Sequence, residues 1–146
     1  MTIQGMHHVS VVVDDLESAK AFFTALGMEL EGEARIEGRW VDRINALDGV
    51  RVDIAMMRTA DGSGRLELTK FHSPAVISPV PENALGNTLG LRSVRFQVDD
   101  LDATLAAVRV QGAELVGEVA RYEDVYRLCY VRGPAGIIVA LSEELA

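Results

Sequence analysis

The sequence predicts an α+β fold made of two tandem copies of a βαβββ module. Three observations predict it: an internal repeat, a strand-then-helix pattern at the start of each copy, and a proline-bearing stretch between the copies. The repeat aligns residues 6–33 with residues 91–118 at a constant offset of 85, and 11 of the 28 pairs are identical. Average residue usage would give on the order of two identities by chance. The pattern therefore indicates a duplication.

Each copy opens with a strand in which apolar residues alternate with other residues. The apolar sides are formed by Val9, Val11 and Val13 in copy one and by Val94, Phe96 and Val98 in copy two. The opposite sides carry His8, Ser10 and Val12 in copy one and Ser93, Arg95 and Gln97 in copy two. We expect the apolar sides to pack under the helices, so that the other sides face away from them.

A helix follows each of these strands. The spacing of a capping box is present twice, as Asp14 with Glu17 and as Asp99 with Asp102. Apolar stripes at helical spacing continue through residues 16–26 and 101–108. Gly27 and Gly112 stand where a left-handed residue commonly ends a helix.

Apolar runs after each helix predict the remaining strands. In copy one they are residues 28–35 with a continuation near Trp40, 50–58 and 65–71, and in copy two residues 113–121, 126–131 and 136–141. Residues 72–90 hold three of the four prolines and are predicted to form the linker. We therefore expect a single domain of residues 1–146, with module one at residues 5–71 and module two at residues 91–143.

Composition excludes several functional classes. The net charge is −8, and the chain has two lysines and no basic cluster. These features argue against nucleic acid and anionic membranes as partners. No apolar run reaches the roughly 18–20 residues of a membrane span, and no signal peptide is recognisable, so a cytoplasmic location is expected. The single Cys129 lies in an apolar run and is predicted to be a buried strand cysteine, not a nucleophile.

The repeated βαβββ order, the strand followed by Val-Asp-Asp-Leu at residues 13–16 and 98–101, and Gly-Ile-Ile-Val-Ala-Leu at residues 136–141 resemble the vicinal oxygen chelate superfamily. That superfamily includes glyoxalase I, extradiol dioxygenases and bleomycin resistance proteins. The resemblance covers about residues 5–143. It implies a cupped mixed sheet that holds a small organic molecule between the modules, and a homodimer. It leaves the reaction open, because one fold serves several chemistries.

The resemblance also implies metal ligands on the first and last strand of each module. His8 and Glu67 match the usual His and Glu in module one, whereas Ser93 and Ala140 replace them in module two. Because a catalytic divalent metal normally has about three protein ligands, this half shell predicts at most weak metal binding. By strand alternation, His7 is expected to point away from His8, so the two should not chelate together.

His8 and Glu67 are also the candidate catalytic residues, as acid and base. For His8, a strand histidine without a chemical role is an equally open interpretation. A carboxylate in an apolar strand needs a partner, and Arg95 or Arg65 would supply one for Glu67. Alternatively, Arg95 would bind a carboxylate or phosphate of the ligand and replace some of the metal's charge. The candidate ligand-binding residues are Arg95, Gln97, Ser93, Ser10, Arg65 and Thr69, with at least one of Tyr122, Tyr126 and Tyr130.

Three functions remain open. The first is an enzyme of the lyase, isomerase or dioxygenase type that uses Glu67 as base or ligand. The second is a metal-free protein that sequesters a small molecule, as bleomycin resistance members do. The third, a structural or partner-binding role with an emptied site, is the least favoured. Metal content, together with turnover of the methylglyoxal–glutathione hemithioacetal and of catechols, would discriminate among them.

Overall fold

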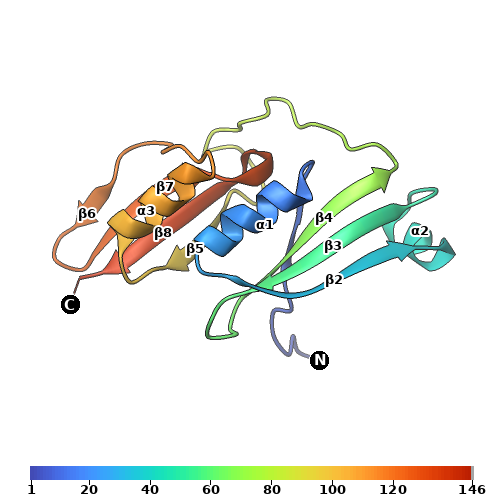
Figure 1. The fold of residues 1–146 in the computed structure, drawn as a ribbon, viewed down its shortest axis with the longest axis horizontal. Helices are drawn as coiled ribbons and strands as arrows, with labels where there is room; N and C mark the ends of the chain where they lie inside the picture. Colours follow the sequence, from blue (N-terminus) through green and yellow to red (C-terminus); the bar gives the residue numbers. More distant parts are fainter. Residues whose placement is uncertain (146) are drawn as a thin grey trace. The chain divides into compact units, whose positions relative to one another are not determined.

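A computed structural model describes residues 1–145 and divides the chain into two compact units, Met1–Ile77 and Ser78–Ala146. Unit 1 contains β1 (Val9–Val12), α1 (Leu16–Ala25), β2 (Glu29–Glu37), α2 (Arg39–Asn45), β3 (Arg51–Arg58) and β4 (Arg65–Ser73). Unit 2 contains β5 (Ser93–Gln97), α3 (Leu101–Val110), β6 (Ala120–Tyr122), β7 (Tyr126–Arg132), a 3-10 turn (Pro134–Gly136) and β8 (Ile138–Glu144). The α+β prediction, with the repeated strand–helix opening, is confirmed (Figure 1).

The two sheets have the same topology. Their strand orders are β1-β4-β3-β2 and β5-β8-β7-β6, and in each the first strand runs parallel to the last while the other neighbours are antiparallel. Ser10 pairs with Glu67 in unit 1, and Arg95 pairs with Ala140 in unit 2. Because the registers match, Arg95 occupies the position of Ser10, and Ala140 occupies that of Glu67.

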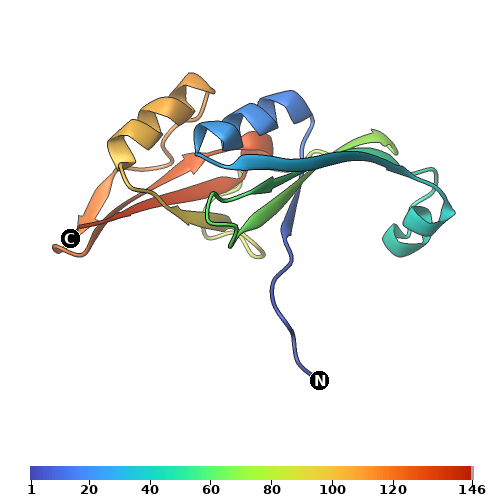
Figure 2. The same ribbon diagram turned by 60° about the horizontal axis from the view of Figure 1, so that its bottom comes forward.

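In unit 1 the two helices lie on opposite sides of the sheet (Figure 2). Phe23 of α1 is fully buried, as are Met57 of β3 and Leu68 of β4 on the sheet face beneath that helix. On the other face, α2 packs at one end of the sheet through a small apolar cluster, formed by Val41, Val50 and Val52 with Ile36, Ile54 and Phe71. The strand face that carries Glu67 therefore keeps an open part that neither helix covers.

In unit 2, α3 alone covers one face of the sheet. Leu101 and Val108 of α3 are fully buried, as are Val139 and Leu141 of β8. Cys129 is 1% exposed, and burial raises the pKa of its thiol, which confirms the prediction of a buried strand cysteine. The opposite face of this sheet carries Arg95, two residues along β5 from Ser93.

The helix caps fall one residue later than predicted. Asp15 and Asp100, not Asp14 and Asp99, accept the capping hydrogen bond from the backbone N–H three residues on, each at 3.0 Å. The reason is that the helices begin after the second Asp, which has the extended backbone of an N-cap residue. The left-handed helix ends are confirmed, with φ of 99° at Gly27 and 89° at Gly112.

The predicted continuation of a strand near Trp40 is wrong, because this segment forms α2. Gly38 directly follows β2 and has a φ of 122°, a backbone conformation that residues other than glycine rarely adopt. The Asp42 carboxylate then accepts the backbone N–H groups of Gly49 and Val50 and fixes the turn after the helix. The side chain of Trp40 is left 57% exposed on α2.

The strand predicted over residues 113–121 is mostly absent. Only its end belongs to β6, and Leu115 makes a single bridge to Val131. The backbone of Glu114 and Val116 still bonds to β7, but this pairing does not run on into β6. No helix within residues 1–145 is long and apolar enough to cross a membrane.

Candidate functional site

A polar cluster surrounds Glu67 on the open face of the unit 1 sheet. One carboxylate oxygen, Oε2, lies 3.5 Å from Nε2 of His8. The other, Oε1, accepts a hydrogen bond of 3.0 Å from the Thr69 hydroxyl and a longer one of 3.4 Å from Ser10. The side chains of His8 and Glu67 are 28% and 22% exposed, so water and small solutes reach both. Four predicted site residues thus lie together, in an arrangement that can accept and donate a proton.

Arg65 does not join this cluster. Its Nε donates a hydrogen bond of 2.9 Å to Oε2 of Glu31, which lies on β2. This bond holds the pKa of Glu31 below its ordinary value. Arg65, one of the two alternative partners predicted for Glu67, pairs with Glu31 instead. The carboxylate of Glu67 is satisfied by hydroxyls and an imidazole of its own unit.

The prediction that His7 points away from His8 is also wrong. Their Nδ1 atoms lie 2.6 Å apart, and the rings meet edge to face. Strand alternation does not apply here, because β1 begins only at Val9. His8 therefore directs Nδ1 at His7 and Nε2 at Glu67.

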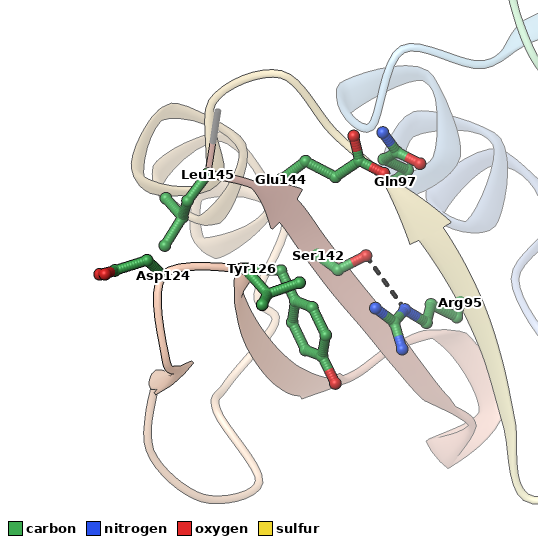
Figure 3. A pocket seen from close by; sticks show the side chains of 8 residues that line it. Arg95, Gln97, Asp124, Tyr126, Ser142, Glu144 and Leu145 are labelled. Atoms are coloured by element: carbon green, nitrogen blue, oxygen red, sulfur yellow. Dashed lines mark hydrogen bonds between the residues drawn. The ribbon is translucent and has the colours of Figure 1, made fainter.

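A pocket of about 650 Å³ opens on the face of the unit 2 sheet that α3 does not cover (Figure 3). It is lined by Arg95, Gln97, Asp124, Val125, Tyr126, Ser142, Glu144 and Leu145. Arg95 and Gln97 were expected at the site, and Tyr126 is one of the three tyrosines considered. Ser93 is exposed on the same strand face but does not line the pocket.

The guanidinium of Arg95 is held from two sides. Its Nε donates a hydrogen bond of 3.0 Å to the Ser142 hydroxyl, and its Cζ lies 5.0 Å from the centre of the Tyr126 ring. Tyr126 in turn stacks on Tyr122 with ring centres 5.5 Å apart. Among the described residues, no other hydrogen bond engages this guanidinium, so its two terminal nitrogens are available to an anion. A guanidinium fixed in this way binds a carboxylate or phosphonate with paired hydrogen bonds.

Ser142 and Glu144 line the pocket but were not among the site residues predicted from the sequence. Both follow Ala140 on β8 at intervals of two, so they share the strand face that Ala140 occupies. The same alternation that identified Arg95 and Gln97 would have found them if it had been continued past residue 141.

The residues present do not fit a tightly bound divalent metal. His8 and Glu67 are two ligands in unit 1, and their partners Ser10 and Thr69 are neutral hydroxyls. Ala140, at the position of Glu67 in unit 2, has no ligand atom. Within residues 1–145, no group of three or more His, Cys, Asp or Glu side chains is placed to hold a metal ion.

The chain is similar to known proteins over most of its length. Residues 7–130 match the sequence profile of the Glyoxalase/Bleomycin resistance protein/Dioxygenase superfamily. The chain belongs to this superfamily. A crystal structure of a glyoxalase family protein from Bacillus cereus is 44% identical in sequence, with a TM-score of 0.94 over 100% of this chain and 97% of that chain.

Two further similar proteins have lower sequence identity to this chain. The protein YaeR of Escherichia coli (strain K12) is 27% identical over 145 residues, which cover 97% of this chain and 98% of YaeR. The fosfomycin resistance protein FosX of Listeria monocytogenes is 15% identical, with a TM-score of 0.61 over 96% of this chain and 90% of that chain. At this identity FosX shares the fold alone.

Proposed function

We propose that the chain is a metal-independent binding protein of the superfamily, and that the pocket of unit 2 holds a small organic molecule by its anionic group. The observation that carries this proposal is the guanidinium of Arg95, oriented by Ser142 and Tyr126 with its terminal nitrogens uncommitted. Most exposed arginines move among many rotamers, so restraint on two sides lowers the entropy lost when an anion binds.

The surroundings of Arg95 support a ligand with an apolar or aromatic body. Tyr126, Val125 and Leu145 supply apolar surface beside the polar groups of Gln97 and Ser142. A concavity that combines apolar surface with oriented polar groups is typical of small-molecule sites. A mutant of FosX has been crystallised with Mn(II) and a dihydroxypropylphosphonic acid, so the same fold accepts an anionic ligand together with a metal in that protein. The donor set of the present chain does not favour such a metal.

The test is a binding screen of small carboxylates and phosphonates, each paired with its neutral amide or ester, followed by isothermal titration calorimetry. We expect the anionic member of the pair to bind and Arg95→Met to weaken it about 10–100-fold, because a charge-assisted paired hydrogen bond is lost. Arg95→Lys should recover only part of the affinity, since lysine keeps the charge but not the planar fork. Arg109→Met, on an exposed position of α3, is the matched control. Equal affinity of wild type and Arg95→Met would refute the proposal.

A second candidate function is a metal-independent isomerase or lyase. The observation that favours it is the 3.5 Å approach of His8 to Glu67, an acid–base pair with hydroxyls on the remaining carboxylate oxygen. In an isomerase reaction Glu67 would remove a proton from one atom of the substrate while a protonated His8 donates a proton to another atom, and transfer of the proton from Glu67 to His8 would then restore both groups.

The two candidates separate in turnover assays. If the protein is an enzyme, a substrate screen that includes the methylglyoxal–glutathione hemithioacetal and catechols should give turnover that Glu67→Gln lowers about 100-fold or more, the usual scale of a lost general base. If it only binds its ligand, Glu67→Gln should leave the affinity of the unit 2 pocket unchanged.

A further inference from the structure

We infer that the pocket of unit 2 selects a small zwitterion, whose anionic group binds Arg95 and whose ammonium group binds Glu144. This inference rests on the proposed function and names the ligand class of the same pocket. It requires that two opposite charges face the pocket without neutralising each other.

The positions of the two charges follow from the strand register. Arg95 pairs with Ala140, and its side chain runs along the sheet to reach the hydroxyl of Ser142. Glu144 lies two residues beyond Ser142 on the same face of β8, about 7 Å farther along the strand. Figure 3 shows the guanidinium beside Ser142 and the Glu144 side chain beside Gln97. The pocket therefore has a cationic part and an anionic part.

Neither charge is cancelled by a neighbour in the described part of the chain. No ion pair joins Arg95 to Glu144 among residues 1–145. The second carboxylate of the pocket, Asp124, is engaged by Arg121, whose Nη2 lies 2.6 Å from it. Gln97, Ser142 and Tyr126 are neutral. Glu144 is thus the uncommitted anion of the pocket, as Arg95 is its uncommitted cation.

This charge pattern discriminates among ligand classes. A simple carboxylate satisfies Arg95 but leaves Glu144 solvated only by water. A dicarboxylate brings a second negative charge towards Glu144 and is repelled, while a simple amine is repelled by Arg95. A molecule with a carboxylate at one end and an ammonium at the other complements both groups. Gln97, beside Glu144, can donate to or accept from a polar group of the ligand.

The test compares three ligands that share a five-carbon chain, namely 5-aminopentanoate, pentanoate and glutarate, by calorimetry at low ionic strength. For the wild type we expect 5-aminopentanoate to bind about tenfold more tightly than pentanoate, and glutarate to bind most weakly. In Glu144→Gln, 5-aminopentanoate and pentanoate should bind with about equal affinity, and glutarate should bind more tightly than it does to the wild type. Glu118→Gln, which removes an exposed carboxylate outside the pocket, should change none of these ratios.

The outcomes separate the two proposals. If Glu144→Gln leaves the ratio of 5-aminopentanoate to pentanoate unchanged, or if the wild type does not distinguish them, the zwitterion inference is wrong while anion binding at Arg95 stands. If Arg95→Met weakens neither ligand, or if neither binds, the proposed function fails and this inference fails with it. Loss of pentanoate binding in Arg95→Met with loss of discrimination in Glu144→Gln supports both.

Discussion

The same sheet face carries opposite charges in the two units. In unit 1 the long side chain is Glu67 on β4, opposite the short Ser10 on β1, and the Thr69 hydroxyl donates to the carboxylate. In unit 2 the long side chain is Arg95 on β5, opposite the short Ala140 on β8. There the hydroxyl of Ser142, at the position of Thr69, accepts from the guanidinium.

This comparison shows how one duplicated scaffold supports two kinds of chemistry. A hydroxyl can donate or accept, so the same small side chain orients an anion in one unit and a cation in the other. The pairing of one long with one short residue keeps the volume on the sheet similar. The change of charge therefore leaves strand order and register intact.

The largest expected effects test whether the two cores are equivalent. Leu68 and Leu141 occupy matching register positions and are both 0% exposed. Replacing either with alanine should lower the free energy of unfolding by about 2–5 kcal/mol, because it removes buried methyl groups and leaves a cavity. Urea denaturation followed by circular dichroism measures this. Leu30→Ala, at a 49% exposed position, is the control and should have little effect. If one replacement lowers the free energy of unfolding by an amount within this range and the other by an amount outside it, the two units are packed differently.

A smaller effect is expected from making unit 2 resemble unit 1. Ala140→Glu places a carboxylate beside Arg95, where it should pair with the guanidinium and compete with any anionic ligand. We expect anion affinity to fall about 10–100-fold. Ala140→Gln has the same size without the charge and should retain more affinity, which separates occlusion from neutralisation. Calorimetry with pentanoate measures both, and identical losses in the two variants would contradict the electrostatic explanation.

The helix caps should respond more weakly and alike. Asp15→Ala and Asp100→Ala each remove the side-chain acceptor of a helix N-terminus, and we expect the thermal midpoint to drop by about 2–5 °C in each case. Asp14→Ala and Asp99→Ala, one residue earlier, are matched controls and should change it less. Differential scanning calorimetry makes the comparison. A larger effect from the earlier residue of each pair would restore the cap positions that the sequence predicted.

The smallest expected effect is a difference in acid sensitivity. Hydrogen bonds and cations lower the pKa of four carboxyls in unit 1 and of one in unit 2, namely Asp15, Glu31, Asp53 and Asp61, and Asp102. Because these pKa values are lower in the folded state, their stabilisation is present above about pH 4 and is lost as the pH falls through the folded values. Hydrogen bonds from Thr59 and Ser63 hold the pKa of Asp61 at about 2.

Unit 1 should therefore lose stability before unit 2 as the pH falls from about 4 to about 2. Four of these groups are exposed and Asp53 is partly exposed, so solvent screens each contribution and the shift is modest. Amide signals in two-dimensional NMR spectra report the two units separately. Asp61→Asn should flatten the acid dependence of unit 1, and earlier loss of the unit 2 signals would contradict the expectation.

The sequence predicted the fold well because alternation and helical stripes are local signals of burial. Matching registers then placed Arg95 opposite Ala140, as the duplication implied. The failures lie where a side chain or a glycine decides the local conformation. Gly38 and Asp42 convert an expected strand into α2. The pattern of hydrophobic residues alone does not predict this helix.

The site was predictable only in part. His8 directly precedes β1, which pairs with the strand that carries Glu67, so their proximity follows from the pairing of β1 with β4. The pairing of Arg65 with Glu31 could not be foreseen, because it depends on the register between β2 and the strands beside it and on a bulge between Leu30 and Gly32. The orientation of Arg95 depends on Tyr126, a contact across strands that no periodicity contains.

The aromatic side chains are divided between the units in a way that has a practical consequence. The one tryptophan is Trp40 on α2 of unit 1, while all three tyrosines, at positions 122, 126 and 130, belong to unit 2. Light absorbed by tryptophan alone therefore excites a reporter in the first half of the chain only. Tyrosine absorption reports on the second half, including the ring beneath Arg95. The duplicated chain thus carries a separate intrinsic optical label in each of its halves.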